Sequence, residues 1–138
     1  MAHFASTRHL TLEGAKAMGT AAEAEATKNG WTIAVAVVDA GGHPLYLARM
    51  DGAVLASYRG ALQKATTSLQ FRRPTKRMDD DVAGGRPHVL GFSEVLPVEG
   101  GMPIEIDGQT IGAIGIGGTT SGPSATQCAN AGLAALKR

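Results

Sequence analysis

Cysteine, aromatic residues and long apolar runs are all scarce in this sequence of 138 residues. Its single cysteine, Cys128, excludes an intrachain disulfide and is typical of a protein from a reducing compartment. No apolar run reaches the ~18 residues of a membrane-spanning helix, and the N-terminal MAHFASTRHL lacks the apolar centre of a signal peptide. We therefore expect a cytoplasmic protein with no membrane partner.

An excess of charge of one sign is missing as well. Thirteen Lys and Arg residues and twelve Asp and Glu residues give a formal net charge of +1. Only three Phe, two Tyr and one Trp are present, whereas nucleic-acid-binding surfaces usually combine a basic patch with aromatic residues that stack on bases. We expect no nucleic-acid partner.

Metal-binding patterns are also lacking. The four histidines do not pair at helical spacing, and no CxxC or HxxE motif occurs, so the sequence predicts no metal site. Three successive carboxylates at Asp79–Asp81 would point in different directions on a helix, and we interpret them as a solvated polar face.

Glycine, in contrast, is abundant. The chain has 19 glycines, about twice ordinary usage. Because 43% of its residues are hydrophobic, this is a folding sequence rather than a low-complexity one. The length fits a single domain over residues 1–138, which can bury roughly 65–70% of the unfolded surface.

The hydrophobic periodicity and turn residues predict the order helix, hairpin, helix, irregular segment, hairpin, helix. The expected helices lie between Thr11 and Asn29, between Leu55 and Pro74, over Thr75–Ala83 and after Ser121, and the expected strands are Trp31–Asp39, Pro44–Arg49, Pro103–Asp107 and Gln109–Gly117. Hairpins form antiparallel sheets, so the predicted fold class is α+β with helices packed on the sheet.

The segment RMDGA, which begins at Arg49, places a guanidinium, a thioether and a carboxylate on successive residues between a strand and a helix. Arg49 and Asp51 can anchor or polarise a polar ligand, and Met50 can pack against an apolar one. His43 lies before this segment, in the hairpin turn, and Lys64 follows it on the helix. We predict that these five side chains converge on one cavity; the alternative is that an Arg–Asp pair only holds the turn.

The strand IGAIGIGG is bare on one face. Because side chains alternate along a strand, Ala113, Gly115 and Gly117 share one face and the isoleucines take the other. Each glycine costs about 0.5–1 kcal/mol relative to alanine, a cost usually offset by the close approach of another group. Three partners remain open: a packed helix, a flat ligand that contacts Gly115 and Gly117, or a neighbouring subunit.

A basic cluster follows the second predicted helix. The run FRRPTKR is too short to bind nucleic acid, but Arg72 and Arg73 suit one or two carboxylates or a phosphate. The alternative is that both arginines complement the negative end of the helix dipole. The two roles are compatible.

Several runs resemble a known family. Between Leu10 and Leu136 they are, in order, LTLEGAKAM, NGWTIAVAVVDAGGHPLYLARMDGA, KATTSLQFRRPTK, LPVEGGMPIEIDGQTIGAIGIGG and CANAGLAAL. Together they resemble the GlcG/HbpS-like family of haem-binding (haem-degrading) proteins. The resemblance implies a profilin-like α+β fold with a five-stranded antiparallel sheet and a homo-oligomer. It also implies a small-molecule ligand, because some members bind haem or related tetrapyrroles.

The chain departs from this family in one place. Members commonly carry an Asp in the turn before the last helix, where this chain has Ser124 and Ala125. A role that requires this carboxylate is not carried over. The acidic iron-binding pattern of some haem-sensing members is not carried over either.

The first of two competing functions, which we favour, is an oligomeric protein that binds haem or another carboxylate-bearing tetrapyrrole. The flat ligand would lie on the glycine face. Arg72 and Arg73 would meet its carboxylates, and Met50 or His43 would face the ring.

The second function is a cofactor-free isomerase, hydratase or hydrolase for a small oxygenated acid in a catabolic pathway. Arg49 would bind the substrate carboxylate, and His43 would transfer protons. Asp51 or Lys64 would orient and polarise the substrate. A third interpretation, a purely structural oligomer, predicts no pocket that collects Arg49, Asp51 and Lys64.

Overall fold

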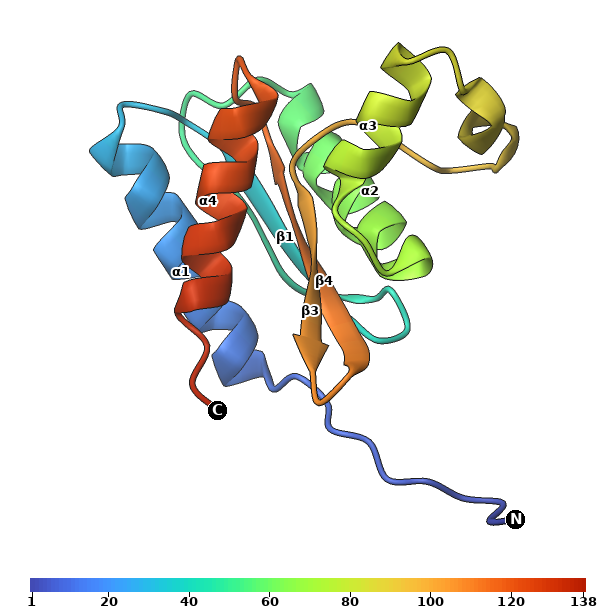
Figure 1. The fold of residues 1–138 in the computed structure, drawn as a ribbon. Helices are drawn as coiled ribbons and strands as arrows, with labels where there is room; N and C mark the ends of the chain where they lie inside the picture. The colour runs from blue at the N-terminus through green and yellow to red at the C-terminus, as the bar shows by residue number, and fades with distance from the viewer.

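The computed structural model, which describes residues 1–138, is an antiparallel sheet between two layers of helices. The helices are α1 (Leu12–Lys28), α2 (Ala56–Phe71), α3 (Thr75–Ala83), the 3₁₀-helix η1 (Pro87–Gly91) and α4 (Gly122–Ala134), and the strands are β1 (Ala34–Asp39), β2 (Pro44–Arg49), β3 (Gly101–Ile106) and β4 (Gln109–Gly117). Figure 1 shows α1 and α4 on one face of the sheet and α2 on the other. The predicted α+β class, with helices packed on an antiparallel sheet, is confirmed.

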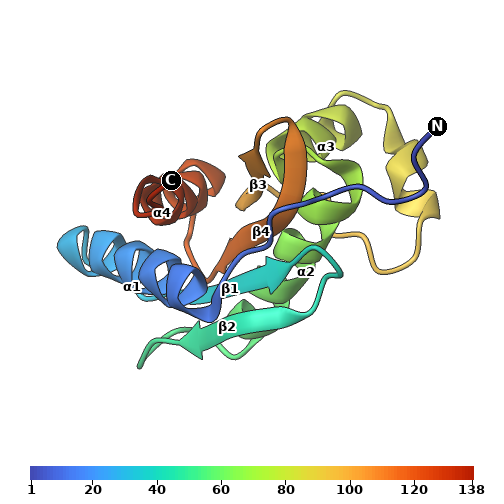
Figure 2. The ribbon, with the colours of Figure 1, turned by 90° about the horizontal axis from the view of Figure 1, so that it is seen from below.

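The sheet has four strands in the order β2–β1–β4–β3, which Figure 2 shows from below. The fifth strand implied by the family resemblance is therefore wrong for this structure. The segment between η1 and β3 instead bonds to side chains. The backbone N–H of Leu96 donates to Thr67 Oγ1 at 3.0 Å, and that of Glu99 donates to Asp79 Oδ2 at 2.9 Å.

The core lies on both faces of the central strand β1. Val35 and Val37 pack with α1 and α4, while Ala34, Ala36 and Val38 pack with the alanines of α2. All five are fully buried. This confirms the prediction that the first strand is covered by helices.

The strand boundaries differ from the predicted ones at two places. β1 begins at Ala34 rather than at Trp31, because the Trp31 N–H bonds back to the Ala26 carbonyl at the end of α1, at 2.8 Å. β3 begins at Gly101 rather than Pro103, because Gly101 pairs with Gly115. Both differences depend on partners that local patterning does not reveal.

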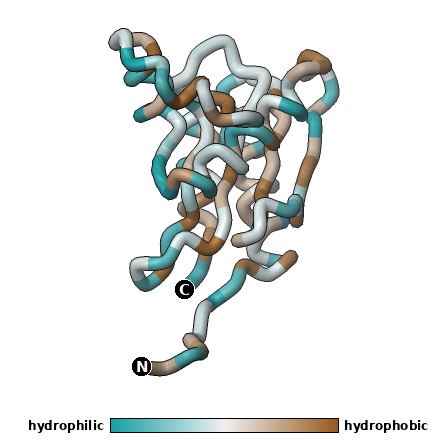
Figure 3. Tube along the Cα trace, turned by 90° about the vertical axis from the view of Figure 1, so that its right-hand side faces the viewer, coloured by the Kyte–Doolittle hydropathy of each residue, from teal (hydrophilic) through white to brown (hydrophobic).

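The N-terminal tail leaves the body of the molecule, as the tube in Figure 3 shows. Residues 1–11 form no helix or strand. Two contacts link the tail to the hairpin of β3 and β4: the Thr7 hydroxyl donates to Gln109 Oε1 at 2.8 Å, and Arg8 lies 3.5 Å from Asp107. α1 then begins at its expected cap, where the Thr11 hydroxyl accepts the N–H of Gly14.

Candidate functional site

The strand β2 separates two of the predicted site residues. His43 precedes this six-residue strand and Arg49 ends it, so their backbones lie about 20 Å apart at ~3.3 Å per residue. The predicted convergence of His43 and Arg49 on one cavity of a protomer is therefore wrong. The two segments are close in sequence, but an extended strand carries them to opposite ends of the sheet.

The RMDGA segment forms the connection from β2 to α2. Arg49 and Asp51 are exposed and take part in none of the three ion pairs of the chain. Met50 packs against the core, and its sulfur accepts the backbone N–H of Ile33 at 3.5 Å. The thioether is thus a structural contact, and the Arg–Asp pair proposed to hold this turn does not form.

Lys64 is buried between α2 and the sheet, with 8% of its surface exposed. Its Nζ donates to the carbonyl oxygen of Ile116 at 2.9 Å. Burial lowers the pKa of this amine, and the carboxylates of Asp79 and Glu99 act in the opposite direction. Arg49, the last residue of β2, lies at the same end of the sheet as Ile116, but the strand β1 separates β2 from β4. Lys64 therefore holds α2 against β4.

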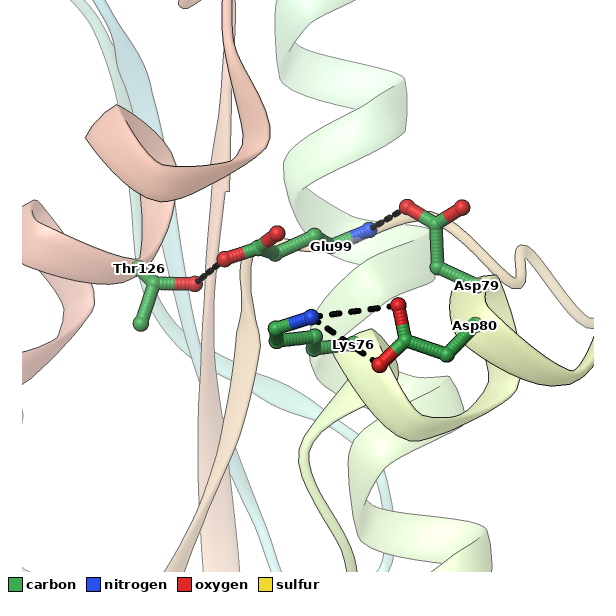
Figure 4. Close-up of polar contacts among 5 residues, drawn as sticks. All are labelled: Lys76, Asp79, Asp80, Glu99 and Thr126. Carbon is green, nitrogen blue, oxygen red and sulfur yellow. Dashed lines mark hydrogen bonds and ion pairs between the residues drawn. The ribbon is translucent and has the colours of Figure 1, made fainter. Parts of the chain in front are cut away.

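A polar network of Asp79, Glu99 and Thr126 joins three separate segments (Figure 4). Asp79 on α3 accepts the backbone N–H of Glu99, and the Glu99 carboxylate accepts the hydroxyl of Thr126 on α4 at 2.6 Å. Lys76 pairs with Asp80 at 2.9 Å. The family carboxylate missing at 124 and 125 is not replaced within α4, but the carboxylate of Glu99 reaches its first turns from the neighbouring loop.

The bare face of β4 is covered by α2. A Cβ added at Gly115 would overlap the carbonyl oxygen of Ala61, and one added at Gly117 would overlap that of Ser57. Close helix packing is thus the partner of this face within the protomer. A flat ligand has no access to Gly115 or Gly117 in this fold, so the ligand-shelf alternative is wrong for these two residues.

A cleft lies at the other end of the sheet. It has a volume of about 600 Å³ and is bounded by the β1–β2 turn (Ala40–Gly42), by one side of α2 and by Glu94. Leu62 and Leu69 supply its aliphatic wall, and Arg72 lies at the C-terminal end of α2. Arg72 is exposed, in a left-handed conformation with φ 54°, and forms no ion pair.

The neighbouring Arg73 differs from Arg72. It is half-buried, its Nε donates to the Phe71 carbonyl at 3.3 Å, and its own carbonyl accepts the Ser68 hydroxyl at 2.8 Å. It does not line the cleft. Of the two predicted basic ligands, only Arg72 is free to meet a ligand there.

His43 lies directly after the turn residues that bound the cleft. Its imidazole is exposed and Nδ1 lies 3.5 Å from Asp39 Oδ1. The Asp39 carboxylate also accepts the backbone N–H groups of His43 and Gly41, and these bonds, His43 first, hold the pKa of Asp39 below its ordinary value. Sequence reasoning did not single out Asp39, although Asp two residues before Gly is typical of such turns.

Two general features complete the description. No group of three or more His, Cys, Asp or Glu side chains is arranged to hold a metal ion. None of the helices is both long enough and apolar enough to span a membrane.

Comparisons with known proteins agree with this architecture. The model of the family "haem degrading protein HbpS-like" matches residues 10–134. The protein GlcG of Escherichia coli K12 is 41% identical over 108 residues, which cover 78% of this chain and 80% of GlcG.

Solved structures of related proteins share the fold. A double mutant of HbpS from Streptomyces reticuli superposes with a TM-score of 0.90 at 36% identity, over 98% of this chain and 92% of that one. A PduOC–haem complex superposes with a TM-score of 0.86 at 27% identity, over 94% and 96% of the two chains. The family model, the GlcG relative and the fold together show that the chain belongs to the HbpS-like family.

Proposed function

We propose that this protein binds haem, or another carboxylate-bearing tetrapyrrole, in the cleft between the β1–β2 turn and α2. The observation that carries the proposal is a cleft of about 600 Å³ that combines the unpaired guanidinium of Arg72 with the aliphatic side chains of Leu62 and Leu69; the exposed imidazole of His43 follows the turn that bounds it. Family membership and the haem complex of the related PduOC support the same ligand class. We place the protein in the cytoplasm, where its single cysteine would stay reduced.

The residues present fit such a ligand. Imidazole is a common axial ligand of haem iron, and His43 is exposed beside the cleft. Arg72 can form a charge-assisted pair with a carboxylate. Leu62 and Leu69 offer an aliphatic surface. When bound, haem would supply an iron centre; Leu62 and Leu69 would contact the ring and Arg72 would pair with a carboxylate.

Polar groups also line this cleft. Gln63 and Gln70, two turns apart on α2, line it, and their side-chain amides form no hydrogen bond within the chain. They suit the polar edge of an amphipathic ligand. The enzyme alternative needs His43 and Arg49 on one substrate. Because β2 holds them apart, that activity would require groups from two protomers.

The test is a titration of the apoprotein with hemin, followed by the Soret band. We expect saturation at one hemin per subunit. Arg72→Ala should weaken binding by roughly 10- to 100-fold, since a charge-assisted contact is lost. Arg77→Ala, an exposed arginine on α3 away from the cleft, should leave it unchanged. No saturable Soret shift, or equal losses for both variants, would contradict the proposal.

A further inference from the structure

The cleft between the β1–β2 turn and α2 is lined by none of the side chains that usually bind haem iron. Haem proteins hold the iron through His, Cys, Met or Tyr, and none of these residue types is part of the lining. His43 directly follows the turn, but its imidazole does not line the cleft. The lining can therefore recognise the organic part of a tetrapyrrole but not its metal.

Two amides of the cleft are separated along one side of α2. Gln63 and Gln70 are seven residues apart, which is about 10 Å along the helix axis at 1.5 Å per residue. Each amide can both donate and accept hydrogen bonds. Leu62 and Leu69 line the cleft with the same spacing. A ligand that meets both amides must therefore carry polar groups at two separated points of an apolar body.

Two charged side chains of opposite sign also line the cleft. Arg72 and Glu94 are both exposed, and neither takes part in an ion pair within the chain. Both have a positive φ, 54° and 63°, which only Asp107 shares among the other non-glycine residues. Glycine adopts this conformation without strain. The cleft thus keeps a group for a carboxylate and a group for an N–H at positions that glycine would favour.

We infer that the ligand of this cleft is a metal-free, open-chain tetrapyrrole with carboxylate side chains. The inference rests on the proposed function and narrows its ligand class. The nitrogens of a haem are bound to its iron, whereas an open-chain tetrapyrrole has free N–H groups and a carbonyl oxygen at each end. Gln63 and Gln70 bind the two ends, Glu94 accepts an N–H, and Arg72 pairs with a carboxylate.

Three tetrapyrrole probes separate the effect of the metal from that of the ring. Hemin has both, protoporphyrin IX has the ring without iron, and biliverdin is open-chain and metal-free. We expect the dissociation constants of hemin and protoporphyrin IX to agree within about 3-fold, because the lining offers no iron ligand. Biliverdin should bind about 10-fold more tightly, because it adds hydrogen bonds at both ends. Absorbance titrations of the full chain at the band of each probe give the three constants.

Variants of the lining test which groups cause this preference. Gln63→Leu and Gln70→Leu each remove one amide and should weaken biliverdin binding about 3-fold while leaving protoporphyrin IX unchanged. Gln127→Leu is the matched control, because this exposed glutamine lies on α4, on the opposite face of the sheet from α2. Arg72→Ala should weaken all three probes alike, since each carries carboxylates. Melting temperatures of the variants separate unfolding from a change at the cleft.

The outcomes distinguish this inference from the proposed function. Tighter binding of biliverdin that depends on the two glutamines supports the inference. If hemin binds about 10-fold more tightly than protoporphyrin IX, or if His43→Ala weakens hemin binding, the iron is recognised; the inference is then overturned while the proposed function stands. A preference for biliverdin that is absent, or that both glutamine variants retain, overturns the inference as well. If none of the three probes binds saturably, both proposals are overturned.

Discussion

Burial decides which single side chains of this protein can react. Cys128 is fully buried in α4, and burial, with a smaller contribution from Glu25, raises the pKa of its thiol to about 11. Because the thiolate is the reactive form, the rise of the pKa from its ordinary value of 9.0 lowers the fraction of thiolate roughly 100-fold. We expect a disulfide reagent such as DTNB to modify the unfolded chain at least about 100-fold faster than the native protein. Equal rates would show that the thiol is accessible.

The buried amine of Lys64 should make the free energy of unfolding depend on pH. Because burial lowers its pKa in the folded state, the unfolded chain binds more protons below the ordinary pKa of 10.5, and folding becomes more favourable as pH rises. We expect the free energy of unfolding of the wild type to increase relative to Lys64→Met between pH 7 and about 10. Urea unfolding at several pH values measures this difference. A difference that stays constant or declines would contradict the shift.

Asp39 and Glu99 differ in whether their contacts could be predicted from the sequence. The DAGGH segment carries the turn chemistry of Asp39, so its contact with His43 was open to local reasoning. Glu99 was not, because its partner Thr126 lies 27 residues away on α4. The contacts of such a residue are created only by the packing of distant elements.

At the scale of elements, helix packing explains the glycines of β4. A Cβ at Gly117 would overlap the backbone of α2, whereas one at Gly60, within α2, would meet nothing within 4 Å. We expect Gly117→Ala to destabilise the protein by about 1–3 kcal/mol and Gly60→Ala to stabilise it by about 0.5–1 kcal/mol. Thermal or urea unfolding of both variants is the measurement. A neutral Gly117→Ala would show that α2 does not pack on this face.

The elements themselves could be predicted from local chemistry. Thr11 caps α1, and Asp107 and Gly108, both with positive φ, form the turn of the second hairpin as expected. The placement of the site could not be predicted in the same way. A motif such as RMDGA indicates which side chains could bind or react with a ligand. The length of the strand before it determines at which end of the sheet these side chains lie. The cleft brings together Gly42 and Arg72 across 30 positions of sequence.

At the scale of the whole molecule, exposed apolar side chains support the proposed homo-oligomer. Leu55 is 73% exposed and Val54 62% at the start of α2, and Leu47 is 43% exposed on the edge strand β2. Such surface suits contact with another chain. We expect light scattering at micromolar concentration to give a multiple of the 14.1 kDa chain mass. A single species at that mass would contradict an oligomer.

The central claim, that a tetrapyrrole binds in the cleft beside His43 and Arg72, is tested most directly by methyl NMR of the protein with hemin. Zinc protoporphyrin serves as the diamagnetic reference. The account predicts that the iron broadens the methyl signals of Leu62 and Leu69, which line the cleft. The methyls of Val54, two residues before the other end of α2, should stay sharp. Broadening of Val54 with sharp Leu62 and Leu69 signals would place the ligand elsewhere and contradict the account.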